Sequence, residues 1–259
     1  MYSGSLKILF ISPRPFWVNN KVVAYVQETS FGAPSGHSQH AVVIWGYLAS
    51  IVKKGWVKTL FILTFLLIGF SRIYLGAHFV WDVLLGWLIG FGIVILFIWI
   101  NRNYSVRIRQ WSKKKKIAIT VLISILIIFL GWVSVAIHAN WEMPELYQQN
   151  VERVFLDKEI NPLSLNGIIT ASATWVGLVL GVILTEEKIP LGIINSDLTK
   201  KLIRFLVGLF GVILLWAGLK FLFPEDIPFV SETLRFFRYF LVGIWISGGA
   251  PVLFKKLNL

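Results

Sequence analysis

Long apolar runs alternate with short polar links along nearly the whole chain. Seven runs stand out, at residues 38–52, 57–70, 79–100, 117–137, 165–184, 202–223 and 234–254. Because about 20 apolar residues in a helix cross a bilayer, this pattern predicts membrane-spanning helices. The first run is short, about fifteen residues or on the order of 22 Å as a helix. We therefore expect an all-α, polytopic membrane helical bundle with about seven spanning helices.

The charged residues of the links give the runs a consistent orientation. Basic residues follow the first, third, fifth and seventh runs, as in Lys53-Lys54 and Lys255-Lys256, whereas the links at 139–164 and 224–226 are rich in acids. Basic loops favour the cytoplasmic side of a membrane. The start of the first run and the connector between the second and third runs are then predicted to lie on the outer face.

The overall composition agrees with a membrane protein and excludes several chemistries. The 259 residues are 56% hydrophobic and 15% charged, with a mean hydropathy of +0.74, whereas about a quarter of a soluble domain is charged. The chain has no cysteine, which excludes disulfides, thiolate catalysis and cysteine-based metal sites. The net charge of +12 lies mostly in the short links, so it indicates topology, and we expect no nucleic-acid partner.

The connector between the second and third runs carries unusual chemistry for its position. It reads SRIYLGAHFVWD from Ser71 to Asp82. If a helix starts near His78, the side chains of His78 and Asp82 share one face and can form a hydrogen bond. A carboxylate on one ring nitrogen fixes the tautomer and leaves the other nitrogen free to react. Arg72, just upstream, can bind a phosphate or carboxylate with its planar guanidinium.

Two further polar motifs precede the first runs. Lys7 is followed, after six residues, by Arg14-Pro15. The tetrad Pro34-Ser35-Gly36-His37 stands at the predicted start of the first run, where Ser35 is a plausible helix cap. The backbone N–H groups at such a helix start favour an anion, and His37 lies at the same end. Because this end and the Ser71–Asp82 connector are both predicted on the outer face, we expect them to form one site.

Taken in order, these three motifs resemble the tripartite signature of the type 2 phosphatidic acid phosphatase superfamily. Its members are integral-membrane lipid phosphatases related to vanadium haloperoxidases. The resemblance implies that His78 is the nucleophile, that Asp82 is its partner and that His37 protonates the leaving group. It also implies a set of phosphate-binding groups, namely Lys7, Arg14, Ser35, Gly36 and Arg72.

The chemistry of phosphoryl transfer fits these residue types. The reaction depends mainly on positioning and charge stabilisation, which three cations and a helix start can supply. A neutral imidazole can attack phosphorus to form a phosphohistidine, and a protonated histidine can protonate the leaving oxygen and later activate water. Since Lys and Arg neutralise the phosphate oxygens, the mechanism requires no metal and no cofactor.

The resemblance covers residues 7–100 and suggests a division of the chain. We expect residues 1–103 to form a phosphatase core and residues 104–259 to form an additional membrane domain of about four helices. The family core has six spanning helices, and the runs at 38–52, 57–70 and 79–100 look like the last three. The first three would precede Lys7, so the chain is expected to lack the N-terminal helices of the family.

These features predict a multi-pass lipid phosphatase of the plasma membrane with its active site on the extracytoplasmic face. The expected substrate is a phosphate or diphosphate monoester of a lipid in the bilayer, of the isoprenoid diphosphate or phosphatidate type. One alternative is a truncated membrane protein that keeps the motifs without activity. A transporter is a weaker alternative, because the runs hold almost no ionisable residues at mid-membrane, where transport pathways usually place them.

Overall fold

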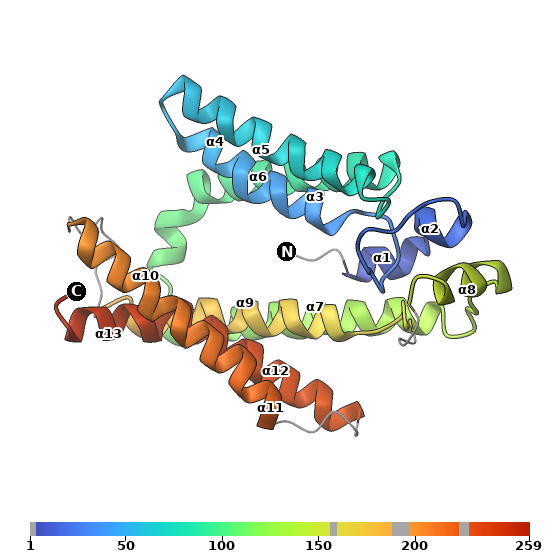
Figure 1. The fold of residues 1–259 in the computed structure, drawn as a ribbon. Helices are drawn as coiled ribbons and strands as arrows, with labels where there is room; N and C mark the ends of the chain where they lie inside the picture. The colour runs from blue at the N-terminus through green and yellow to red at the C-terminus, as the bar shows by residue number, and fades with distance from the viewer. Residues whose placement is uncertain (1–3, 156–159, 188–196, 223–227) are drawn as a thin grey trace. The chain divides into compact units, whose positions relative to one another are not determined.

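The computed structural model describes residues 4–155, 160–187, 197–222 and 228–259, and every regular element in these ranges is a helix (Figure 1). The chain divides into two compact units, Met1–Arg109 with Gly131–Leu165, and Gln110–Leu130 with Asn166–Leu259. The acidic link 224–226 and the charged residues 157–159, which contributed to the predicted topology, lie outside the described residues.

Six helical segments in the described ranges are long and apolar enough to cross a membrane, which confirms the all-α, multi-pass prediction. They correspond to the last six apolar runs. Their bounds are α5 (Gly55–Tyr74), α6 (Val80–Arg109), α7 (Lys113–Ile137), α9 (Asn166–Thr185), Leu198–Phe221 and Val230–Lys256. The fifth of these segments contains α10 (Leu198–Ile213) and η2 (Leu214–Gly218) and enters α11 (Leu219–Leu222). The sixth joins α12 (Pro228–Ile244), η3 (Trp245–Gly249) and α13 (Ala250–Lys256).

The first apolar run differs from the other six. It forms a continuous helix from α3 (Gly36–Ala41) through the π-helical turn η1 (Val42–Gly46) to α4 (Tyr47–Ile51). These elements have 6, 5 and 5 residues, so the helix is on the order of 24 Å long and is not among the six spanning candidates. Its first turn belongs to the polar tetrad around His37, which leaves too little apolar length for a full span.

Glycines of α6 set the packing of the first unit. In Figure 1, α3, α4, α5 and α6 lie alongside one another. A Cβ atom added to Gly86 would lie 2.6 Å from the backbone oxygen of Ser35, and one added to Gly90 would lie 2.9 Å from that of Gln39. Small residues spaced by four allow two helix backbones to approach closely. This contact brings the start of α3 against the part of α6 that carries Asp82.

The polar link after α7 folds back onto the N-terminal segment. It contains α8 (Glu145–Glu152), which packs against α2 (Pro15–Val18). Asn150 Nδ2 donates a hydrogen bond of 2.8 Å to the backbone oxygen of Trp17. The same segments share an apolar core of Phe16, Trp17, Phe31, Val151 and Phe155. Sequence patterns treated this link only as an acidic loop, because neither its short helix nor its distant partner produces a long apolar run.

The second unit is built on close contacts of small residues. Helices α9 and α12 pack together through Gly177 and Gly243, where an added Cβ on Gly243 would lie 2.9 Å from the backbone oxygen of Thr174. Within the same unit, Ser124 of α7 and Ser172 of α9 form a buried hydrogen bond of 2.6 Å. Such contacts are typical of helix association in membranes, where burial of apolar surface gives little driving force.

Candidate active site

The turn between α5 and α6 places Arg72 and His78 side by side. The backbone oxygen of Arg72 accepts hydrogen bonds from the amides of Ala77, at 3.1 Å, and His78, at 3.2 Å. Gly76 makes this reversal possible with a φ of +66°, a conformation that side chains disfavour. An added Cβ on Gly76 would also lie 2.6 Å from the backbone oxygen of Val23. The reversal therefore brings two motif residues together at the end of one helix and the beginning of the next.

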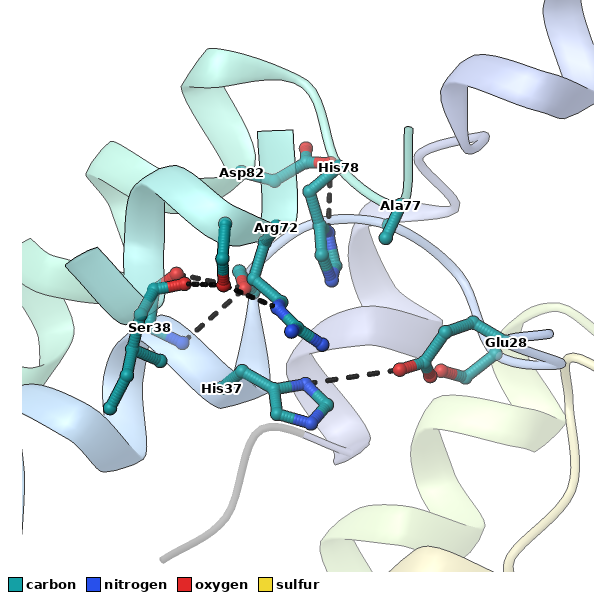
Figure 2. Close-up of polar contacts among 12 residues, drawn as sticks. Glu28, His37, Ser38, Arg72, Ala77, His78 and Asp82 are labelled. Atoms are coloured by element: carbon teal, nitrogen blue, oxygen red, sulfur yellow. Dashed lines mark hydrogen bonds and ion pairs between the residues drawn. The ribbon is translucent and has the colours of Figure 1, made fainter. Parts of the chain in front are cut away.

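His78 and Asp82 form the predicted pair. The Nδ1 atom of His78 lies 3.2 Å from Oδ2 of Asp82, and both side chains are almost fully buried (Figure 2). The same oxygen accepts the Phe79 amide hydrogen at 3.0 Å, so Asp82 also satisfies a free donor at the start of α6. One carboxylate thus orients the imidazole and caps the helix.

Arg14 faces the other nitrogen of the His78 ring. Its Nη1 atom lies 3.4 Å from Nε2 of His78 and donates to the backbone oxygen of Ala77 at 2.9 Å. Arg14 is completely buried, and its Nη2 atom donates to the backbone oxygen of Phe31 at 3.2 Å. With Asp82 at Nδ1 and a cation at Nε2, the favoured tautomer carries its proton on Nδ1 and a lone pair on Nε2.

Charge and burial keep the imidazole of His78 neutral. Burial lowers the pKa of His78 to about 4, the hydrogen bond to Asp82 opposes this shift, and the charges of Arg14 and Lys7 add to it. Burial likewise lowers the pKa of Arg14 to about 10, which leaves the guanidinium protonated at neutral pH. A neutral ring with a free lone pair is the form that can act as a nucleophile.

Lys7 lies beside Arg14 because both bind the same carbonyl. The Nζ atom of Lys7, in α1 (Gly4–Phe10), donates to the backbone oxygen of Phe31 at 2.6 Å. Burial and the nearby charge of Arg14 lower the pKa of Lys7 to about 7, although Glu28 and Asp82 oppose the shift. Lys7 therefore titrates near neutral pH, and its charge is present mainly below that pH.

The Pro34–His37 tetrad begins α3 as the sequence predicted. The Oγ atom of Ser35 accepts a hydrogen bond from the Ser38 amide at 3.4 Å, which confirms Ser35 as the helix cap. The Ser35 amide donates to the backbone oxygen of Asp82 at 2.9 Å. This bond ties the tetrad to the helix that holds the His78–Asp82 pair. Gly36 is the first residue of α3, so its amide belongs to the end of the helix that favours anions.

His37 stands at the more open side of the site. Its side chain is 53% exposed, and its Nδ1 atom lies 3.8 Å from Oε1 of Glu28. Burial lowers the pKa of His37, Glu28 raises it, and Arg72, Lys7 and His40 lower it. In Figure 2 the side chains of His37, Arg72 and His78 converge. Arg72 donates from Nε to the Ser71 hydroxyl at 3.2 Å.

The structure adds groups that the motifs did not include. Glu28 contacts His37, and its Oε2 atom lies 3.4 Å from Nη2 of Arg14. Ser30 accepts hydrogen bonds from Lys7, at 3.3 Å, and from Arg14. An added Cβ on Gly32 would lie 2.9 Å from Oδ2 of Asp82, so only a residue without a side chain fits there. All three lie in the irregular segment 19–33, where no periodicity marks a residue. The described ranges contain no group of three or more His, Cys, Asp or Glu side chains that could hold a metal.

Comparison with known proteins agrees with this geometry. The family model described as the PAP2 superfamily matches residues 1–106, and the one described as PAP2 superfamily phosphatase, transmembrane extension, matches residues 169–259. The chain is 33% identical over 98 residues to phosphatidylglycerophosphatase B of Bacillus subtilis, which is 34% of this chain and 46% of that protein. It is 32% identical over 103 residues to undecaprenyl-diphosphatase of Sulfolobus acidocaldarius, which is 39% of this chain and 49% of that protein.

The chain thus spans about half the length of the curated relatives that it matches. No solved structure matches it. The two family models together account for the motif-bearing segment and for most of the second unit. On these matches and the three intact motifs, the chain belongs to the PAP2 superfamily and carries the transmembrane extension of that superfamily.

Proposed function

We propose that this protein is a lipid phosphatase that hydrolyses a phosphate or diphosphate monoester through a phosphohistidine at His78. The arrangement of the His78 ring supports this most directly. Its Nδ1 atom is held by Asp82 at 3.2 Å, and its Nε2 atom lies on the side of Arg14 at 3.4 Å. The lone pair on Nε2 is then directed toward a cationic group that can bind the phosphate.

In the first step, Nε2 of His78 attacks phosphorus. A nitrogen–phosphorus bond forms while the bond between phosphorus and the leaving oxygen breaks, and His37 gives that oxygen a proton. In the second step, His37, now neutral, accepts a proton from water, and the water oxygen attacks phosphorus. The nitrogen–phosphorus bond breaks, phosphate leaves and His78 returns to its neutral form. Asp82 keeps the ring oriented and stabilises the positive charge that develops on it.

The cations of the site would bind the transferred phosphoryl group. Lys7 and Arg14 meet at the Phe31 carbonyl, and Arg72 lies beside His78 through the turn at Gly76. The amide of Gly36 adds a donor at the start of α3, and Ser35 supports that start as its cap. Preorganised charges of this kind stabilise the transition state of phosphoryl transfer.

We infer a lipid substrate of the isoprenoid diphosphate or phosphatidate type. The site residues are next to helices that can span a membrane, so a headgroup at the bilayer surface can reach them. One relative is named for phosphatidylglycerophosphate and the other for undecaprenyl diphosphate. We assign the proposed catalytic groups to a core of residues 1–103 and treat 104–259 as an added membrane domain, of which the link after α7 packs back onto the core.

The charge pattern of the links supports a site on the extracytoplasmic face of the plasma membrane. A reporter fused after Lys54 or Lys116 should then behave as cytoplasmic, and one placed within 139–155 should behave as external. The reverse pattern at all three positions would place the site on the cytoplasmic face and would rule out a substrate in the outer leaflet.

The central experiment is to trap the phosphoenzyme. The purified chain would be mixed with a lipid phosphate labelled in its phosphorus, quenched in base and tested for a label that base preserves and acid removes. We expect label on the wild-type chain and none on His78→Ala. Turnover without any label on His78 would contradict the mechanism, and absence of both label and turnover would favour the inactive alternative.

A further inference from the structure

The carboxylate of Glu28 joins two parts of the proposed site. Its Oε1 atom lies 3.8 Å from Nδ1 of His37, and its Oε2 atom lies 3.4 Å from Nη2 of Arg14. Figure 2 shows the Glu28 side chain extending toward the His37 ring from the loop that precedes α3. Resting on the function proposed above, we propose that Glu28 is a positioning residue that holds Nδ1 of His37 and keeps this ring protonated for transfer of the proton from Nε2.

The charges around His37 explain why it needs such a partner. Its surroundings are mostly unfavourable to a proton, because burial, Arg72, Lys7 and His40 all lower its pKa. Among the described residues, Glu28 is the group that raises it. A general acid must carry a proton when the substrate is bound, so a carboxylate at Nδ1 offsets the cations that the phosphate requires.

The geometry assigns the two ring nitrogens different tasks. A proton on Nδ1 of His37 is held toward Glu28, and the proton on Nε2 can pass to the leaving oxygen. When the bond between phosphorus and that oxygen breaks, Nε2 loses its proton and the ring becomes neutral while Glu28 keeps Nδ1 protonated. The water molecule that attacks the phosphohistidine returns a proton to Nε2. Glu28 itself gains and loses no proton in this cycle.

Arg14 does not depend on Glu28 for its position. Its guanidinium also donates to the backbone oxygens of Ala77, at 2.9 Å, and Phe31, at 3.2 Å, and it is completely buried. Removing the Glu28 charge should therefore leave Arg14 in place, but it also removes a charge that raises the pKa of Lys7. In a Lys7→Arg background this cation stays charged, and the variant only removes a negative charge near the bound phosphate, so there we expect kcat to fall while KM stays the same or decreases.

The test compares Glu28→Gln with the wild-type chain and with Glu142→Gln as a matched control. Glu142 is an exposed acid of the same unit and is not among the groups that affect His37. The value of kcat decreases as the pH rises and His37 loses its proton, and in Glu28→Gln this decrease should begin at a lower pH than in the wild-type chain. An ion pair of this kind shifts a pKa by about 1 unit, which corresponds to about tenfold lower kcat near neutral pH with an alkyl phosphate lipid. The defect should shrink with a nitrophenyl phosphate, whose leaving oxygen needs little protonation.

A titration independent of activity separates this inference from the proposed function. Histidine ring nitrogens would be followed by NMR in the detergent-solubilised chain, with His37 assigned from a His37→Asn sample. We expect the pKa of His37 to be lower in Glu28→Gln than in Glu142→Gln and to be largely restored in Glu28→Asp. An unchanged His37 titration in Glu28→Gln would overturn the role of Glu28, whether or not the chain is a phosphatase. A shifted titration in a chain without phosphatase activity would preserve the contact and refute the proposed function.

Discussion

The site contains two histidine–carboxylate pairs that differ in burial and origin. His78 and Asp82 lie four residues apart at the start of α6, with side-chain exposures of 1% and 3%. His37 and Glu28 come from a helix and the preceding loop, with exposures of 53% and 27%. Burial keeps the first imidazole neutral and Asp82 fixes its tautomer, which suits a nucleophile. The second imidazole is more open and lies among cations, so it needs a carboxylate to remain charged, which suits an acid. The combination of an imidazole and a carboxylate thus supports a neutral histidine in one pair and a protonated histidine in the other.

Removal of the buried histidine should have the largest effect. His78→Ala leaves no nucleophile, and the loss in kcat should be at least about 10⁴-fold, as for other residues that carry a covalent intermediate. A better leaving group should not restore activity, since no phosphoenzyme forms. Asp82→Asn should behave similarly, because an amide at Nδ1 favours the wrong tautomer. Steady-state rates with a lipid phosphate and with nitrophenyl phosphate measure both variants, and rescue of His78→Ala by the second substrate would reverse the assigned roles.

Removal of the exposed histidine should be less severe and should depend on the substrate. His37→Ala retains the nucleophile but lacks the acid, so we expect a loss of roughly 10² to 10⁴-fold with an alkyl leaving group. Much of this loss should disappear with nitrophenyl phosphate. The ratio of the two rates, in His37→Ala and in the wild-type chain, is the quantity to compare. An equal loss with both substrates would show that His37 does not protonate the leaving oxygen.

Substitution of a glycine in α6 can test whether the contact between α3 and α6 positions one histidine–carboxylate pair relative to the other. In Gly86→Ala, the new Cβ would press on the backbone oxygen of Ser35 and displace the start of α3 with His37. A misplacement of about 1 Å can reduce kcat by up to about 10²-fold. Gly92→Ala on the same helix is the control, since an added Cβ there meets nothing within 4 Å. Equal activity of the two variants would mean that the contact between α3 and α6 does not position His37.

The dependence on pH should give the smallest effect. The free site needs His78 neutral, which holds above its pKa of about 4, and Lys7 charged, which holds below its pKa of about 7. The value of kcat/KM should therefore rise through about pH 4, fall as His37, whose pKa is lowered by burial and nearby cations, loses its proton, and fall further through about pH 7 as Lys7 loses its charge. The arginine of Lys7→Arg keeps its charge at all these pH values. Any decrease in kcat/KM that remains at high pH in this variant therefore reports the loss of the proton from His37. Comparing the two chains on one substrate cancels the titration of the substrate. An identical alkaline fall in both would exclude Lys7 as its source.

Local patterns predicted the parts of the molecule that are close in sequence. Long apolar runs indicated the six spanning segments, and the four-residue spacing of His78 and Asp82 indicated their pairing. The cap at Ser35 followed from its position before a helical run. Each of these features depends on a single helix or turn, so the pattern of the local sequence is enough to predict it.

The parts that were not predicted depend on contacts between distant segments. The pairing of Glu28 with Arg14 requires the path of an irregular loop, and that of Asn150 with Trp17 joins residues 133 positions apart. The spacing of Gly86 and Gly90 does signal a close helix contact, but it does not identify α3 as the partner. The shortness of the first helix arises because its initial turn serves the site rather than the membrane.

The packing of α8 against α2 has a consequence for the order in which the chain is made. The segment that holds Arg14 and the Phe31 carbonyl shares its apolar core with Val151 and Phe155. During synthesis, the three motifs leave the ribosome well before this support exists. The apolar core beside the segment that carries Arg14 is then complete only after α7 has been inserted and α8 has been made. The first unit is therefore expected to mature only after synthesis has passed Phe155, rather than as soon as the three motifs have emerged.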